Sequence, residues 1–273
     1  MKLTPEQQQQ VIAIAIAAGE AIEEVRETAF SVEEKADDTP VTTADFRAHE
    51  VIQQRLAVEL PQWPLLSEEG GNPVQAHEQQ WSAYWLVDPL DGTKEFIANN
   101  GEYTVNLAFV VQGEAQWGVV YAPALGVLYW GGEQYGAWRA TVTQHTHIGE
   151  AEPLQVRSPG TPLVLLGSRR HGGMAQEQLL AALEKRWQQV EQHKVGSSLK
   201  LCRVAEGEAD IYPRFGPTAE WDTAAGQAVL EGAGGRVWTR QGTPLRYQRP
   251  HHINPDFYAL GGKAAHWQWL ADL

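Results

Sequence analysis

Two acidic residues follow a short apolar segment at a point where the chain must turn. In WLVDPLDGTKEF, residues 85–96, these are Asp88 and Asp91. Two converging carboxylates suit a hard divalent cation such as Mg²⁺, and a helix start after Gly92 and Thr93 would offer free N–H groups to a phosphate. Cation and phosphate together would make the adjacent negative charges tolerable. The alternative is that both aspartates only cap a turn and a helix, as aspartate often does in loops.

The elements around this segment must place the carboxylates at a strand end. Residues 84–87 predict a strand, and Pro89, which lacks an N–H, is expected to stop its hydrogen-bonding ladder. Gly92 permits a tight turn, and Thr93 is a suitable first residue for a helix over 94–99.

Other segments carry acidic residues in comparable places. Asp37 and Asp45 flank the turn-like TPVT at 39–42, Glu68 follows the apolar Leu65–Ser67, and Asp222 begins a predicted helix. Taken singly, each of these could be a helix cap or a solvated loop charge.

Together the segments resemble the metal-binding signatures of the inositol monophosphatase superfamily, in the order and spacing of that family: KADDTPVTTAD (35–45), LLSEE (65–69), WLVDPLDGTKEF (85–96) and EWDTAAGQAV (220–229). Three more resemble the substrate loops of its bacterial subgroup of CysQ-type 3'(2'),5'-bisphosphate nucleotidases: GSRRH (167–171), GSSLK (196–200) and YPRFGPT (212–218). The resemblance extends over residues 10–260.

The resemblance implies roles for particular oxygen donors. The side chains of Glu68, Asp88, Asp91 and Asp222 and the main-chain carbonyl of Leu90 would bind two Mg²⁺ ions, and Asp37 would serve a third, weaker one. Two ions about 4 Å apart could stabilise the attacking and the leaving oxygen of an in-line displacement, without a phosphoenzyme. Thr93 would orient the attacking water, with Asp37 or Glu68 behind it.

A second group of residues is expected to bind the substrate. Near the reacting phosphate these are Leu90, Asp91, Gly92, Thr93 and Asp222. Ser197 and Lys200 lie where a helix is predicted to begin, and Arg214 offers a planar fork, so the three could hold a second phosphate. The resemblance adds His171 as a contact of the nucleotide. Without it, Lys200 would count as an ordinary surface lysine and Arg214 as a structural ion-pair partner.

The implied activity is Mg²⁺-dependent removal of the 3'-phosphate from adenosine 3',5'-bisphosphate, giving AMP and phosphate. A second expected substrate is 3'-phosphoadenylylsulfate, the implied setting is sulfur assimilation, and inhibition by lithium is expected. One alternative is an inositol or other sugar monophosphatase, which would share every metal ligand. The other is a noncatalytic nucleotide-sensing module.

Composition limits the other function classes. The net charge of -13 argues against sequence-independent binding to nucleic acid or to an anionic bilayer. No protein partner can be inferred from the sequence. The single cysteine, Cys202, suits a reducing compartment and is expected to be buried on a helix. The apolar run at 11–18 is shorter than a membrane span, so a cytoplasmic location is predicted, and contact with the cytoplasmic face of the inner membrane is implied by resemblance alone.

The sequence of 273 residues predicts two lobes with a layered α/β (α+β sandwich) fold of the sugar phosphatase type. Residues 1–150 form an α+β lobe with most metal ligands, and 151–273 an α/β lobe with the substrate loops and the last ligand. Predicted helices cover 5–27, 44–60 (Phe46, Ile52 and Leu56 inward), 174–186, 198–206 and 222–230. Predicted strands cover 65–67, 84–87, 103–111, 116–121, 127–130, 136–139, 163–166, a segment near 190, 210–212 and 236–238.

Overall fold

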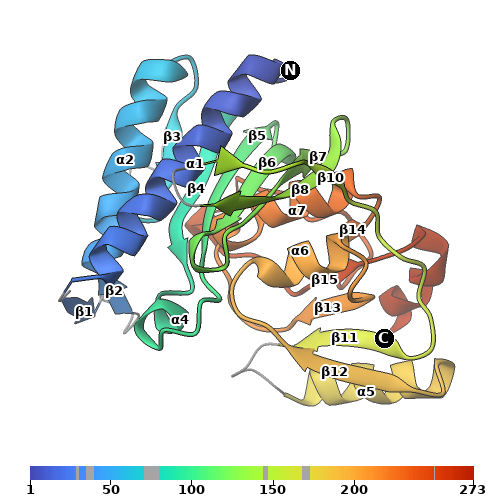
Figure 1. The fold of residues 1–273 in the computed structure, drawn as a ribbon. Coiled ribbons are helices and arrows are strands. Elements are labelled where there is room, and N and C mark those ends of the chain that lie inside the picture. The colour runs from blue at the N-terminus through green and yellow to red at the C-terminus, as the bar shows by residue number, and fades with distance from the viewer. Residues whose placement is uncertain (29–30, 35–39, 71–79, 144–146, 168–172, 249) are drawn as a thin grey trace.

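The structure, a computed structural model, describes residues 1–273 except 29–30, 35–39, 71–79, 144–146, 168–172 and 249. Its elements stack in five layers (Figure 1): two long helices, a large sheet, two shorter helices, a small sheet, and a final layer with one helix and the C-terminal turns. The predicted layered fold is confirmed.

The helices begin and end close to the predicted positions. The first starts after Thr4, whose hydroxyl accepts the N–H of Gln7 while the Gln7 side chain accepts the N–H of Thr4, a capping box. The α-helices are α1 (Pro5–Arg26), α2 (Thr43–Glu59), α4 (Thr93–Ile97), α5 (Met174–Arg186), α6 (Leu199–Ala205) and α7 (Ala224–Gly232). Short 3₁₀ helices are Pro123–Leu125, Glu220–Asp222 (η2), Pro250–His252, Ala264–His266 and Gln268–Asp272.

Within the described residues, the large sheet has eight strands, in the order β10-β8-β7-β6-β5-β4-β3 with β9 paired to β8. All pairs are antiparallel except β3 with β4. Its strands are β3 (Leu65–Ser67), β4 (Ala83–Asp91), β5 (Thr104–Val111), β6 (Glu114–Ala122), β7 (Val127–Gly132), β8 (Gly136–Thr143), β9 (His147–Ile148) and β10 (Glu152–Pro153). A separate pair joins β1 (Val32–Glu34) to β2 (Pro40–Thr42).

The small sheet has the order β12-β11-β13-β15-β14. The strand β11 runs parallel to both of its neighbours, while β15 runs antiparallel to both of its own. The strands are β11 (Leu163–Gly167), β12 (Val190–Lys194), β13 (Ile211–Arg214), β14 (Arg236–Thr239) and β15 (Phe257–Leu260).

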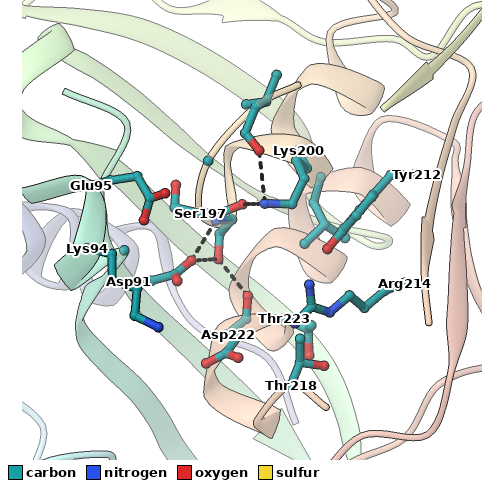
Figure 2. A pocket seen from close by; sticks show the side chains of 15 residues that line it. Asp91, Lys94, Glu95, Ser197, Lys200, Tyr212, Arg214, Thr218, Asp222 and Thr223 are labelled. Carbon is teal, nitrogen blue, oxygen red and sulfur yellow. Dashed lines mark hydrogen bonds between the residues drawn. The ribbon is translucent and has the colours of Figure 1, made fainter. Parts of the chain in front are cut away.

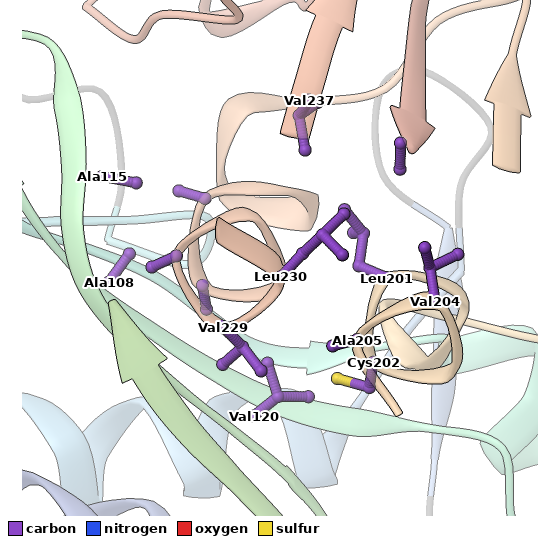
Figure 3. Close-up of a cluster of buried hydrophobic side chains, with 14 of the residues drawn as sticks. Ala108, Ala115, Val120, Leu201, Cys202, Val204, Ala205, Val229, Leu230 and Val237 are labelled. Atoms are coloured by element: carbon purple, nitrogen blue, oxygen red, sulfur yellow. The ribbon is translucent and has the colours of Figure 1, made fainter. Parts of the chain in front are cut away.

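Alternating side chains along the strands explain the layers. On β4, Trp85 and Val87 pack toward α1 and α2, whereas Tyr84 and Leu86 pack toward α6 and α7 on the other face. The helices α6 and α7 are covered on both sides, so they are apolar almost all round; Figure 3 shows their side chains meeting those of both sheets. Cys202 is buried in this layer, as predicted.

The helix α7 lies unusually close to the large sheet. A Cβ atom added to Gly118 on β6 would lie 2.6 Å from the carbonyl oxygen of Ala225 on α7. Only glycine allows that approach. Asp222 ends η2 and lies two residues before the first residue of α7, so this packing fixes where Asp222 meets β4 and β5.

Several details differ from the sequence predictions. Residues Pro40–Thr42 of the turn-like TPVT form the strand β2, and the strands β1, β9 and β10 were not predicted. Phe46 was expected to face inward but is 44% exposed, whereas Ile52 and Leu56 are buried as predicted. Pro89 does not end β4: the strand continues to Asp91 through an irregularity in its pairing with β5. Such a bulge needs no ladder hydrogen bond from the proline. The strand β15 was not predicted at all.

The proposed boundary between two lobes near residue 150 stays a prediction. The strand β10 at Glu152–Pro153 still pairs with β8 of the large sheet, and β11 is the first strand of the small one. Among the described helices, none combines the length and apolar character needed to cross a membrane.

Candidate active site

Two neighbouring parallel strands bring the first acidic residues together. Glu68 follows the last residue of β3, and its N–H donates to the carbonyl of Val87 on β4 at 3.1 Å. The next residue of β4 is Asp88. Like ends of parallel strands meet at one edge of a sheet, so Glu68 lies beside Asp88.

Hydrogen bonds from the protein orient the three aspartates. Asp88 Oδ1 accepts the N–H of Leu90 at 3.0 Å, and Asp222 Oδ2 accepts the N–H of Ala219 at 2.9 Å. Asp91 Oδ2 accepts both the N–H and the hydroxyl of Ser198, at 2.6 and 2.7 Å. In each case these bonds reach one carboxylate oxygen, which leaves the other oxygen for a ligand.

The electrostatics of this group are unfavourable without a cation. Burial, followed by the charges of Glu68, Asp91 and Asp222, raises the pKa of Asp88 well above its usual range, and its side chain is almost wholly buried. Burial, followed by Asp91 and Glu68, raises the pKa of Asp222 in the same way. Like charges held close together in a buried place are what a divalent cation would neutralise.

The donor set fits Mg²⁺, although its side chains are not closed around one point. Among the described residues, no three His, Cys, Asp or Glu side chains are placed to hold one ion together. Mg²⁺ does not require this, because it keeps several waters and commonly binds through one or two carboxylates and a substrate phosphate. The main-chain oxygen of Leu90, 3.5 Å from the Thr93 hydroxyl, adds a neutral donor near these carboxylates.

Thr93 lies beside these carboxylates and is oriented by an aspartate. Its hydroxyl donates to Asp45 Oδ1 at 3.1 Å, while Asp45 Oδ2 accepts the N–H and the hydroxyl of Thr42 at 2.8 and 2.7 Å. Burial raises the pKa of Asp45 against these hydrogen bonds. Asp45 thus orients Thr93 in the described part of the chain, and the expected place of Asp37 or Glu68 behind the attacking water stays a prediction.

Two of the predicted site residues, Asp37 and His171, lie outside the described residues. In the sequence, Asp45 is marked only as an acid that flanks TPVT. The signal that could have identified it is the sequence TTAD: a capping box joins Thr42 to Asp45 and turns the aspartate inward at the start of α2.

Two adjoining cavities open at this edge of the large sheet. The carboxylate cavity, about 570 Å³, is lined by Glu68, Asp88, Leu90, Thr93, Trp221 and others. The anion cavity, about 190 Å³, is lined by Ser197, Lys200, Tyr212, Arg214 and others. The two cavities share six residues: Asp91, Gly92, Lys94, Glu95, Thr218 and Asp222.

Besides the exposed Lys94, two cations from different elements line the anion cavity, Lys200 and Arg214 (Figure 2). Lys200 on α6 is only 7% exposed, and its Nζ donates to the carbonyls of Ser197 and Val195 at 2.6 and 3.3 Å. Arg214 on β13 donates from Nη2 to the carbonyl of Pro217 at 2.7 Å. Its Nε is buried and has no hydrogen-bond partner within the described part of the chain.

Both cations are poorly compensated in this state. Burial lowers the pKa of Lys200 to about 8, and Asp91 is the largest influence that opposes this effect. A buried ammonium with a depressed pKa, next to a guanidinium with an unpaired N–H, is a place where an anion would bind favourably. The structure thus brings Ser197, Lys200 and Arg214 together in the anion cavity, as predicted. Glu68, Asp88 and Thr93 line the carboxylate cavity. Asp91 and Asp222 line both cavities.

Comparison with known proteins supports the resemblance over the whole chain. The model of the inositol monophosphatase family matches residues 5–270. The 3'(2'),5'-bisphosphate nucleotidase CysQ of Salmonella typhimurium is 46% identical over 255 residues, which cover 91% of this chain and 97% of the relative. The Haemophilus influenzae protein of the same name is 32% identical and covers 95% of this chain and 94% of the relative.

Solved structures give the same result. The crystal structure of CysQ from Bacteroides thetaiotaomicron, 38% identical, superposes with a TM-score of 0.80 and covers 94% of this chain and 98% of its own. An IMPase of Thermotoga maritima, 23% identical, has a TM-score of 0.75 and covers 97% and 95% of the two chains. At that identity it supports the fold alone.

Proposed function

The chain belongs to the inositol monophosphatase family, and from this membership and the two cavities we propose that it hydrolyses the 3'-phosphate of adenosine 3',5'-bisphosphate, giving AMP and phosphate. Relatives named 3'(2'),5'-bisphosphate nucleotidase support this substrate, with identities up to 46% over most of the chain. Dependence on Mg²⁺ is general in the family. We propose two or three ions for this chain, and 3'-phosphoadenylylsulfate as a second substrate.

One observation carries the proposal: a carboxylate cavity adjoins an anion cavity, and Asp91 and Asp222 line both. A substrate with two phosphates requires such a pair of sites, one for the group that reacts and one for the group that does not. A monophosphate would leave Lys200 and the buried N–H of Arg214 without an anion.

Different residues of the chain would bind the cation, orient the water and bind the substrate. Glu68, Asp88, Asp91, Asp222 and the carbonyl of Leu90 would hold Mg²⁺, which when bound neutralises phosphate charge and makes water a better nucleophile.

The Thr93 hydroxyl donates a hydrogen bond to Asp45. The Thr93 oxygen can therefore accept a hydrogen bond from the attacking water and fix the direction of attack. Lys200 and Arg214 hold the 5'-phosphate, with Ser197 beside them. That binding is remote from the reacting phosphorus, so it lowers KM and aligns the 3'-phosphate.

The test compares substrates with one and two phosphates on variants of the anion cavity. We expect Lys200→Ala, and more strongly Lys200→Ala with Arg214→Ala, to lower kcat/KM for adenosine 3',5'-bisphosphate at least about tenfold. Charge-assisted hydrogen bonds contribute about 1.5–3 kcal/mol each, which sets that scale. Adenosine 3'-monophosphate should be a poor substrate for the parent and should lose little more in the variants.

A matched control is Arg203→Ala. Arg203 lies on the same helix as Lys200, pairs with Glu206 and Glu208, and does not line either cavity. Equal losses on both substrates in the Lys200 and Arg214 variants would refute the second-phosphate site and favour a sugar monophosphatase. No phosphate release from any substrate with Mg²⁺ would favour a noncatalytic nucleotide sensor.

A further inference from the structure

Ser198 occupies an unusual position between the two cavities. It is 2% exposed and directly follows Ser197 in the loop that leads into α6. Its N–H and its hydroxyl both donate to the same oxygen of Asp91, at 2.6 and 2.7 Å. No role for Ser198 followed from the sequence motif GSSLK.

The hydroxyl of Ser198 also contacts two other elements. Its Oγ accepts the Nδ2–H of Asn106 on β5 at 2.9 Å, and it lies 2.6 Å from the main-chain oxygen of Asp222. One hydroxyl proton therefore serves two acceptors, Asp91 and the carbonyl of Asp222. The ionised carboxylate is the stronger acceptor, while the main-chain N–H of Ser198 holds Asp91 independently.

These contacts make one side chain the junction of three elements. Asp91 ends β4 in the large sheet, Asp222 precedes α7, and Ser198 opens α6, whose Lys200 lines the anion cavity. A second bond ties the same loop to the first part of the chain, because Gly196 N–H donates to Glu102 at 2.7 Å. A shift of the 195–200 loop would therefore move Asp91 directly.

We propose that Ser198 is a positioning residue that fixes Asp91 for Mg²⁺ and transmits occupation of the anion cavity to the cation site. The inference rests on the proposed function only in assigning Mg²⁺ to Asp91 and Asp222 and a nucleotide phosphate to Lys200. Mg²⁺ and nucleotide then strengthen each other's binding by the same factor, as linkage requires.

The test measures binding without turnover. Calorimetry gives the Mg²⁺ affinity of the protein alone, then the affinity for AMP, which has the 5'-phosphate and no reacting group, with and without Mg²⁺. We expect Ser198→Ala to weaken Mg²⁺ binding about tenfold, the lower end of the 10–100-fold range for residues that orient metal ligands. The lower end applies because the main-chain N–H still holds Asp91. The factor by which Mg²⁺ improves AMP binding should also fall, and the part that remains measures the direct neutralisation of Asp91 by the cation.

Two variants separate positioning from packing. Arg203→Ala is the matched control for Mg²⁺ binding, because Arg203 lies on the helix that Ser198 opens, pairs with Glu206 and Glu208, and lines neither cavity. Its Mg²⁺ affinity should equal the parent's. Ser198→Cys keeps the shape of the side chain with a larger atom and a weaker donor, and its Mg²⁺ affinity should fall between those of the parent and Ser198→Ala. This second variant keeps the proposal testable should the alanine variant fold poorly.

The outcomes are distinguishable from failure of the proposed function. A parent that binds neither Mg²⁺ nor AMP contradicts the function itself. A parent that binds both, with Ser198→Ala unchanged in Mg²⁺ affinity and in coupling, overturns the role of Ser198 and leaves the function standing.

Discussion

Replacing Asp88 by Asn should stabilise the cation-free protein and remove its stabilisation by Mg²⁺. Asn has nearly the same shape, and its oxygen can still accept the N–H of Leu90 that Asp88 accepts at 3.0 Å. What changes is the charge. Burial and the neighbours Glu68 and Asp91 raise the pKa of Asp88, so an ionised Asp88 opposes folding at neutral pH until a cation binds.

The size of the effect can be estimated. For a chain of 273 residues the entropy of unfolding is roughly 0.6 kcal/mol/K. Mg²⁺ at 100 times its Kd contributes about 2.7 kcal/mol, which raises the parent Tm by about 5 °C. A tenfold change in a protonation equilibrium corresponds to about 1.4 kcal/mol, so neutralising Asp88 should raise the Tm of the cation-free protein by at least about 2 °C.

The assay is calorimetric melting of parent and variant, with EDTA and with saturating Mg²⁺. The matched control is Asp210→Asn, because Asp210 is also fully buried but is held by both nitrogens of the Arg157 fork at 2.8 and 2.7 Å. Removing that charge leaves a cation unpaired and should lower the Tm. The reasoning is refuted if Asp88→Asn lowers the Tm as Asp210→Asn does, or keeps the parent's response to Mg²⁺.

Three further outcomes follow from the same geometry. Asp91→Asn and Asp222→Asn should fold normally and lose at least about 10²-fold in Mg²⁺-dependent kcat; near-normal turnover in both would exclude them as ligands. Because burial lowers the pKa of Lys200 to about 8, the free enzyme loses this proton above that pH. The kcat/KM for the bisphosphate should then fall by up to about tenfold per pH unit, and a Lys200→Met variant with the same decline would contradict this. Gly118→Ala should cost about 1–3 kcal/mol by overpacking against α7, while Gly160→Ala, with no atoms within 4 Å of the added Cβ, should melt like the parent.

Much of the fold could be predicted because its local signals agree with its packing. The inward face of α1 repeats at helical spacing, and Val11, Ile14 and Val25 are all buried. The strand β15 was missed because it is short and buried on both faces, so Phe257–Leu260 is a plain apolar run without alternation. Phe46 fits the helical pattern but lies at the edge of the covered face, which a pattern alone does not locate.

The candidate site, like the fold, could be predicted from the sequence only in part. Glu68, Asp88 and Asp91 could be placed together because Glu68 follows β3, while Asp88 and Asp91 lie in the last part of the neighbouring strand β4. The contact of Thr93 with Asp45 joins residues 48 positions apart, and that of Asp91 with Ser198 joins residues 107 apart. No local pattern specifies such pairs. They depend on how α2 and α6 pack against the large sheet, which is a tertiary property.

The net charge of the chain explains why the two cavities must share residues. At -13 the protein repels a nucleotide bisphosphate at long range, so attraction has to come from within the site. Lys200 and Arg214 supply it in the anion cavity, but in the carboxylate cavity Asp88 and Asp222 oppose a phosphate until a cation has bound. Asp91 lines both cavities. As long as no cation neutralises its charge, Asp91 attracts Lys200 and repels the phosphate that Lys200 would bind. Neutralising Asp91 therefore favours the substrate in both cavities at once, and Mg²⁺ should bind first or together with the nucleotide.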